Sequence, residues 1–298
     1  MPEDMIVATN VNQSSANGIQ ASNDNNTKNN GSGKQWQGKS GEGKQWNGAP
    51  RRKKSEANIL DPEKLIFKGW RDTPNPKDMK IIDLITKETL SLSFEVFPPK
   101  EESSFEPVEA AAFEIAKLSP AFMSVTYGAG GGTSKYTVEI AADLKEKYGV
   151  TALAHLTCVA SSREHVHRVV ERLKEHEIQN IMALRGDIPK DGVIHHDYKY
   201  ASELIAELKT LGDFCIGGAC YPEGHVESRT KAEDILHLKE KVEAGCDFLT
   251  TQMFFDNDLL YNFLYQIRDK GITVPVVAGI MPVTNAKQMK RILSMSGA

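Results

Sequence analysis

A glutamate stands in the middle of an apolar, strand-like stretch, "SLSFEVFPPK", and its type and position could serve chemistry. Alternate side chains of an extended strand share a face, so Glu95 lies on the face of Ser93 and Phe97 while the opposite face is uniformly apolar. A carboxyl group placed there can act as a general acid, or it can form an interior ion pair. The stretch alone leaves both interpretations open.

Four further strand-like stretches carry polar side chains in the same way. By alternation, the following residues share faces: Ser124 with Thr126, His155 with Leu153 and Thr157, Arg185 with Ala183 and Asp187, and Gln252 with Thr250 and Phe254. Side by side, the five strands would direct these groups into one cavity. An ion pair such as Glu95 with Arg185 remains open for any single residue, but the whole set exceeds what one pair needs.

These stretches belong to a regular alternation of strands and helices. The strand candidates are residues 92–98, 122–128, 151–158, 180–187, 215–222, 248–255 and 274–282, with helix-like runs between them and an amphipathic helix before them over 75–90. The pattern predicts an α/β protein, a (β/α)8 TIM-type barrel with seven of eight βα units present. The active site of such a barrel lies at the carboxyl ends of its strands. We expect the chain to be part of a longer protein, with its barrel incomplete at the C-terminus and two strand edges open.

Composition limits the class of protein. The 298 residues are 40% hydrophobic and 26% charged with a net charge of −4, which is typical of a globular protein and gives no sign of nucleic-acid binding. No apolar run approaches the ~20 residues of a membrane span, and no signal peptide is recognisable, so we expect a cytoplasmic protein without membrane association. Residues 1–55 predict a disordered low-complexity tail, followed by the barrel domain over 56–298.

Two other features suggest chemistry that the spacing does not support. The four cysteines form no CxxC pair, so we predict reduced core cysteines and no metal site. His155 and Cys158 stand three residues apart on a strand and therefore point to opposite faces, which excludes a catalytic dyad. The glycine-rich "TYGAGGGT" does not complete a dinucleotide-binding fingerprint, and we interpret it as a βα loop that approaches a ligand.

One short motif occurs in each βα unit, in the order "LSFEVFPPK", "SVTYGAGGGT", "AHLTC", "ALRGD", "YPEGH", "TTQMFFD" and "GIMPVTN". From about Met79 to the end, the chain resembles the catalytic barrel of the methylenetetrahydrofolate reductase family. The resemblance implies an FAD-containing oxidoreductase of one-carbon metabolism and methionine biosynthesis. It would reduce 5,10-methylenetetrahydrofolate to 5-methyltetrahydrofolate by a ping-pong reaction, with NADH or NADPH as the electron donor. We further expect a homo-oligomer.

The resemblance also implies roles for matching positions. Glu95 resembles the general acid, for which burial would favour the protonated form. Asp187 resembles a catalytic aspartate that tunes the flavin, and Gln252 and Gln288 resemble folate-binding residues. Positions that resemble contacts of FAD or the nicotinamide are Thr126, Tyr127, Ala129, His155, Arg185, Gly186, Asp187, Ala201, Tyr221, His225, Asp234 and Lys241. Of these, Arg185 and Lys241 would offset the charge of the diphosphate.

Two alternative functions remain. The first is another flavin barrel oxidoreductase of the proline dehydrogenase type, against which "TTQMFF" and "LRGD" argue. The second is a non-catalytic or regulatory truncated paralogue. It is favoured by His237 and Glu240, which stand where members of the family carry Asn and Arg, and by the missing eighth strand.

Overall fold

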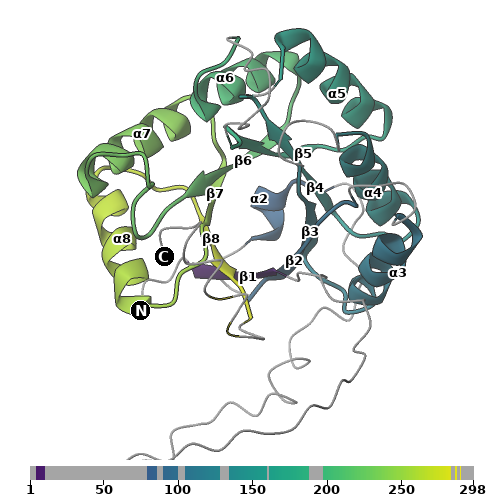
Figure 1. Cartoon of the computed structure of the whole chain (residues 1–298), viewed down its shortest axis with the longest axis horizontal. Coiled ribbons are helices and arrows are strands. Elements are labelled where there is room, and N and C mark those ends of the chain that lie inside the picture. Colours follow the sequence, from purple (N-terminus) through teal and green to yellow (C-terminus); the bar gives the residue numbers. More distant parts are fainter. Residues whose placement is uncertain are drawn as a thin grey trace, which may run out of the picture. The chain divides into compact units, whose positions relative to one another are not determined.

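Eight parallel strands close into a ring in the order β1 to β8, as Figure 1 shows. The computed structural model describes residues 5–10, 79–85, 90–99, 105–127, 134–159, 161–187 and 197–282, with 286 and 289. The strands are β1 (Met5–Asn10), β2 (Leu92–Val96), β3 (Phe122–Val125), β4 (Ala152–Thr157), β5 (Asn180–Leu184), β6 (Cys215–Cys220), β7 (Phe248–Thr251) and β8 (Val276–Ile280). The last seven strands confirm the predicted ones, and they confirm the TIM-type barrel.

Helices follow the strands and surround the ring (Figure 1). They are α3 (Phe105–Ala116), α4 (Ser134–Glu146), α5 (Arg163–Glu175), α6 (Ala201–Leu211), α7 (Lys231–Glu243) and α8 (Asn257–Asp269). Hydroxyl or carboxylate side chains cap three of them at the N-terminus: Ser162 accepts a hydrogen bond from His165 N, Thr230 accepts one from Glu233 N, and Asp256 accepts one from Asp258 N. Each cap satisfies an N–H group that has no partner within the helix, so it fixes where the helix begins.

The strand that closes the ring comes from the N-terminal segment. β1 pairs in parallel with β2, where Val7 lies opposite Leu92, and with β8, where Met5 lies opposite Val276. The prediction of a disordered tail over 1–55 is therefore wrong for 5–10, and the rest of that tail lies outside the described residues. The expectation of two open strand edges is wrong as well, because β1 lies between β2 and β8.

Large side chains fill the inside of the ring. They include Phe122, Leu153, Met182, Phe248 and Val277, all nearly inaccessible to solvent. Gly217 of β6 makes this packing possible: a Cβ atom there would lie 2.6 Å from Cζ of Phe248 and 3.1 Å from Cε of Met182. The interior is thus a packed core rather than a pore, as in other barrels of this type.

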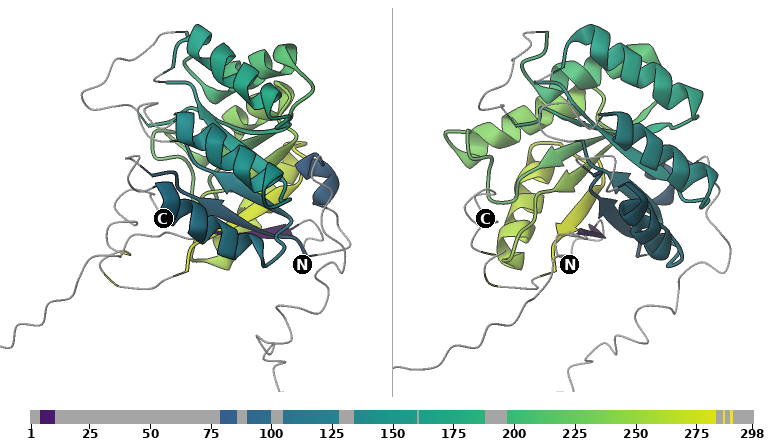
Figure 2. Two further views of the ribbon diagram at one scale, coloured as in Figure 1. Left: turned by 90° about the vertical axis from the view of Figure 1, so that its right-hand side faces the viewer. Right: turned by 45° about the vertical axis from the view of Figure 1, so that its right-hand side comes forward.

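A short helix, α2 (Ile81–Leu84), lies against the amino end of the barrel. Figure 2 shows it at one end of the ring, and Ile81 and Leu84 are completely buried. Asn180 at the start of β5 holds it in place: its Oδ1 accepts a hydrogen bond from Ile81 N at 2.8 Å, and its Nδ2 donates to Met79 O at 3.2 Å. Of the longer helix predicted over 75–90, the structure describes residues 79–85 and 90, and only Ile81–Leu84 is helical among them. The prediction is therefore wrong for the other described residues, and α2 forms the floor of the barrel.

For β5, the sequence predicted the wrong face: Ala183 was placed on the inward face together with Arg185 and Asp187. Ile181 and Ala183 pack in the outer core against the helices, whereas Met182 and Leu184 belong to the interior. The strand ends at Leu184, so Arg185 and Asp187 follow it and are not positioned by its pleat. The register agrees, because Met182 pairs with the inward-facing His155 of β4.

Candidate functional site

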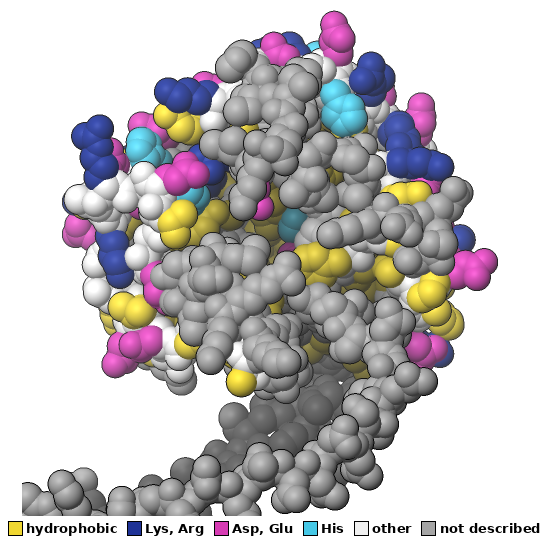
Figure 3. Space-filling view, in the orientation of Figure 1, with side chains coloured by type: hydrophobic (Ala, Val, Ile, Leu, Met, Phe, Trp, Pro, Cys, Tyr) yellow, Lys and Arg dark blue, Asp and Glu magenta, His cyan; other side chains and the backbone are white. Residues whose placement is uncertain are grey.

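A cavity of about 690 Å³ lies at the carboxyl ends of the strands, whereas α2 lies at their amino ends. In the space-filling view of Figure 3, charged side chains of both signs lie around the periphery of this face, and hydrophobic side chains are visible in the hollow near its centre. The predicted site residues that line the cavity are Glu95, Thr126, Tyr127, His155, Arg185, Gly186, Asp187, Ala201, Tyr221, His225, Asp234, Lys241 and Gln252. Ala129 and Gln288 lie outside the described residues.

Glu95 enters the cavity from β2, between residues of the next two strands. Its Oε2 accepts a hydrogen bond from Oγ of Ser124 on β3 at 3.4 Å and lies 3.6 Å from Nε2 of His155 on β4. The side chain is 25% exposed, so it reaches ligands while resting on the barrel interior. Sequence alternation correctly predicted that these three residues face inward.

His155 is a neutral group at physiological pH. Burial lowers the pKa of its imidazole to about 4, because the charged form loses hydration without compensation. Within the described part of the chain, its Nε2 atom is buried without a hydrogen-bond partner. A buried polar atom of this kind at a cavity wall is suited to contact a polar group of a ligand.

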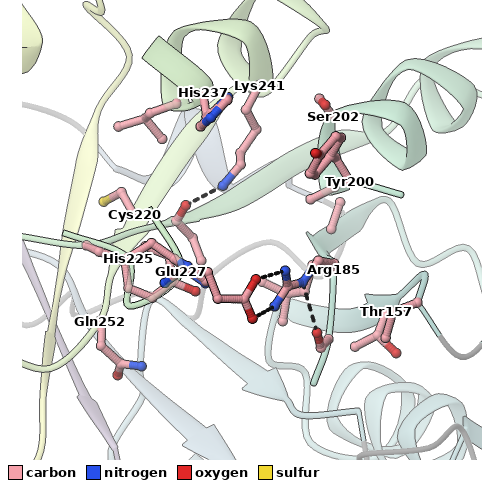
Figure 4. A pocket seen from close by; sticks show the side chains of 18 of the residues that line it. Thr157, Arg185, Tyr200, Ser202, Cys220, His225, Glu227, His237, Lys241 and Gln252 are labelled. Carbon is pink, nitrogen blue, oxygen red and sulfur yellow. Dashed lines mark hydrogen bonds and ion pairs between the residues drawn. The ribbon is translucent and has the colours of Figure 1, made fainter. Parts of the chain in front are cut away.

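Arg185 does not pair with Glu95. Its guanidinium forms two hydrogen bonds to the carboxylate of Glu227, at 2.5 and 2.7 Å, and its Nε donates to Gly186 O at 3.3 Å. Figure 4 shows this pair extending across the cavity from the end of β5 to the loop after β6. The interior ion pair between Glu95 and Arg185, which the sequence left open, is therefore not formed.

The loop after β6 is held by Asp234 from the first turn of α7. Its carboxylate accepts hydrogen bonds from His225 N at 3.2 Å and from Ser228 Oγ at 3.3 Å. The His225 ring meets Tyr221 edge-to-face at 4.6 Å, and burial lowers the pKa of His225. Asp234 thus serves as a structural tie for the loop that carries Glu227.

Lys241 of α7 brings a buried positive charge to the cavity wall. Its Nζ donates a hydrogen bond to Ala219 O at 2.6 Å, as Figure 4 shows, and burial lowers its pKa. Space for its stem comes from Gly218, where a Cβ atom would lie 2.9 Å from Cδ of Lys241. A buried ammonium beside a cavity favours an anionic ligand group, which would compensate its lost hydration.

Backbone groups complete the wall. Gly186 adopts φ +85°, and a Cβ atom there would lie 2.9 Å from Cβ of Thr157, so only glycine fits this position. Ala201 and Ser202, the first residues of α6, also line the cavity. The N-terminus of a helix carries unpaired N–H groups and a partial positive charge, both of which favour anions.

Sequence reasoning missed Tyr200 and Glu227 at the cavity, whereas it singled out His237 and Glu240 as departures from the family pattern. Tyr200 and His237 have nearly parallel rings with centroids 6.4 Å apart, and His237 Nδ1 lies 3.3 Å from Oε2 of Glu240. Both His237 and Glu240 line the cavity. Glu227 was missed because no motif singles it out, although its place two residues after His225 in the same loop was a usable signal.

The described part of the molecule gives no support for a disulfide, a Cys–His dyad, a metal site or a membrane-spanning helix. All four cysteines are buried and free there, as predicted. Cys158 packs in the outer core while His155 faces inward, so they form no dyad. Within the same residues, no group of three or more His, Cys, Asp or Glu side chains could hold a metal ion, and no helix is long and apolar enough to cross a membrane.

Comparison with solved structures supports the fold. An uncharacterised protein from Clostridium thermocellum, which binds two copies of 5-methyl-5,6,7,8-tetrahydrofolic acid, matches with a TM-score of 0.52. The match covers 72% of this chain and 73% of that one, at 14% sequence identity. At that identity, the similarity shows a shared barrel.

Comparison of sequences is more specific. The chain is 38% identical to the 5,10-methylenetetrahydrofolate reductase of Pectobacterium carotovorum over 70% of this chain and 69% of that one. It is 34% identical to methylenetetrahydrofolate reductase (NADH) 1 of Arabidopsis thaliana over 72% of this chain and 39% of that one. The methylenetetrahydrofolate reductase family model matches residues 80–298. The chain that builds this barrel and this cavity therefore belongs to the methylenetetrahydrofolate reductase family.

Proposed function

We propose that the chain reduces 5,10-methylenetetrahydrofolate to 5-methyltetrahydrofolate with electrons from NADH or NADPH, using FAD in a ping-pong reaction. Family membership supports reduction of methylenetetrahydrofolate. The cofactor, the electron donor and the kinetic scheme are the proposed part. The observation that supports the proposal most directly is that all predicted site residues within the described part of the chain line one cavity.

The cavity suits FAD in size and in chemistry. A volume of about 690 Å³ lies within the range of about 300–1,000 Å³ typical of cofactor sites. We propose that Lys241 and the N-terminus of α6 bind the diphosphate, because both favour anions and both reach the cavity wall. When bound, FAD supplies two-electron transfer between the nicotinamide and the folate.

We assign the role of general acid to Glu95. Opening the five-membered ring of methylenetetrahydrofolate requires a proton on a ring nitrogen, and a carboxyl group within hydrogen-bond reach can donate it. Neutral His155 beside Glu95 adds no positive charge that would favour the carboxylate form. Ser124 holds the carboxyl group in one orientation by its hydrogen bond to Oε2.

Two further residues would position substrate and cofactor. The amide of Gln252, at the end of β7, reaches the cavity and can both donate to and accept from the pterin edge. Asp187, after β5, is exposed within the same cavity, where its negative charge would act on the flavin. Both assignments follow from the family motifs in which the two residues stand.

The purified protein tests this function directly. Expected results are a yellow protein, bleaching by NADH or NADPH without oxygen, and recovery of the absorbance on addition of methylenetetrahydrofolate. Bleaching without a folate response would favour another flavin barrel oxidoreductase instead. A folded, colourless protein that takes up no FAD would favour a non-catalytic paralogue, and either result would overturn the proposal.

A further inference from the structure

Glu227 takes part in an ion pair that spans the cavity. Both of its carboxylate oxygens accept hydrogen bonds from the guanidinium of Arg185, while Arg185 Nε binds Gly186 O. A bidentate pair fixes the plane of the guanidinium as well as its position. The third hydrogen bond ties the same plane to the backbone at the end of β5. Figure 4 shows these contacts, which together restrict the orientation of Arg185 within the cavity.

The backbone at Glu227 is fixed by further hydrogen bonds within its loop. Glu227 N donates a hydrogen bond to Nδ1 of His225 at 3.2 Å, and His225 N donates to Asp234 at 3.2 Å. This chain of hydrogen bonds begins on α7, passes along the loop after β6 and ends at Glu227. It gives the loop a fixed position from which Glu227 can orient Arg185.

The pair also changes the charge that the cavity presents. The hydrogen bonds between the two side chains raise the pKa of Arg185 and lower that of Glu227, so both groups stay charged and their charges offset each other. Lys241 differs, because its Nζ binds a backbone carbonyl and its charge has no such compensation from that partner. Arg185 and Lys241 both line the cavity, as does Arg229, but Arg185 and Lys241 are not equivalent toward an anion.

We propose that Glu227 is a positioning residue of the cofactor site, which fixes the guanidinium of Arg185 and offsets its charge at the flavin. This inference rests on the proposed binding of FAD. A flavin takes up negative charge with its electrons, so an uncompensated arginine nearby would raise its midpoint potential. Glu227 would keep that midpoint potential low, and the negative charge of Asp187 would act on it in the same direction. The diphosphate would then depend on Lys241 rather than on Arg185.

The substitution Glu227→Gln tests the inference, because it keeps the size of the side chain and removes its charge. We expect the midpoint potential of bound FAD to become more positive and its dissociation constant to rise up to about fivefold, the effect of one partly exposed ion pair. Glu227→Asp keeps the charge and should return the potential toward that of the unsubstituted protein. Glu223→Gln, in the same loop but outside the cavity lining, is the matched control and should change neither value. An unchanged or more negative potential in Glu227→Gln would overturn the proposal.

A measurement without flavin separates this inference from the proposed function. In nuclear magnetic resonance spectra, the bidentate pair should slow rotation of the Arg185 guanidinium and give separate signals for its Nη hydrogens. In Glu227→Gln those signals should merge, and in Glu223→Gln they should stay separate. If the Arg185 Nη signals were the same in Glu227→Gln as in Glu223→Gln, Glu227 would not position Arg185, and this conclusion would hold whether or not the protein binds FAD. Failure of the unsubstituted protein to bind FAD would instead refute the proposed function.

Discussion

Nε2 of His155 lies 3.6 Å from Oε2 of Glu95, and the two side chains come from strands separated by β3. Because burial lowers the pKa of His155 to about 4, the contact at neutral pH is between a carboxyl group and an uncharged ring. The relationship is thus not a salt bridge under those conditions. At neutral pH the His155 ring therefore places no positive charge beside Glu95.

Glu95→Gln should separate the two half-reactions. We expect bleaching of the flavin by NADH or NADPH to continue at nearly the normal rate. Reoxidation by methylenetetrahydrofolate should slow about a hundredfold to ten-thousandfold, the usual contribution of a general acid. Stopped-flow absorbance of the flavin measures both steps. Glu223→Gln is the control, and an equal loss in both half-reactions would show that Glu95 acts structurally.

His155 should make the fold sensitive to acid. Its pKa is about 4 in the folded chain and about 6.5 when unfolded, so between these values only the unfolded state binds the proton. This contribution to stability is fully present above pH 6.5 and is lost as the pH falls toward 4, by about 3 kcal/mol in all. Urea unfolding at pH 7 and 4.5 should show a smaller acid loss in His155→Asn. The partly exposed His237→Asn should behave like the unsubstituted protein, and equal acid losses in all three would contradict the prediction.

Lys241→Met should change binding and stability in opposite directions. Removing a buried ammonium while keeping its apolar stem should leave the free energy of unfolding equal or higher. The affinity for FAD should fall about ten- to a hundredfold, because a hydrogen bond to a charged group is lost. Fluorescence titration and urea unfolding measure the two effects. Lys239→Met on the same helix, with a side chain 45% exposed, should bind FAD normally; equal affinity in both variants would argue against Lys241 as the anion site.

Gly217→Ala should disturb the barrel interior. The added methyl group would lie 2.6 Å from the ring of Phe248, and we expect a loss of about 1–3 kcal/mol in the free energy of unfolding. Phe248→Leu creates space at the same point. A double variant that is more stable than the sum of the two single effects would confirm the contact, whereas simple additivity would contradict it.

Much of the barrel could be predicted because local patterns and the final packing agree. β2, β3 and β4 are short and alternate regularly, so Glu95, Thr126 and His155 were placed correctly inside. For β5 the same rule failed, because its apolar residues face both the interior and the helices and leave no polar face to set the phase. Arg185 reaches the cavity through the chain beyond the strand, which alternation does not describe.

The remaining features depend on contacts between segments that lie far apart in the chain. β1 precedes a polar, low-complexity stretch, and its partners in the sheet, at residues 92 and 276, lie far along the chain. Glu227 reaches Arg185 across 42 positions, a pairing that no periodicity encodes. The anchoring of α2 by Asn180 is of the same kind, since its hydrogen bond joins residues 99 positions apart.

The position of α2 determines which end of the barrel ligands can enter. Ile81 and Leu84 seal the amino end of the barrel, and the cavity opens at the other end. Under the proposed ping-pong reaction, the nicotinamide and the folate would use this same end of the barrel in turn. Sequential binding of two large substrates would then be a consequence of a barrel that is closed at its amino end by the four residues of α2 and by Asn180, which anchors them.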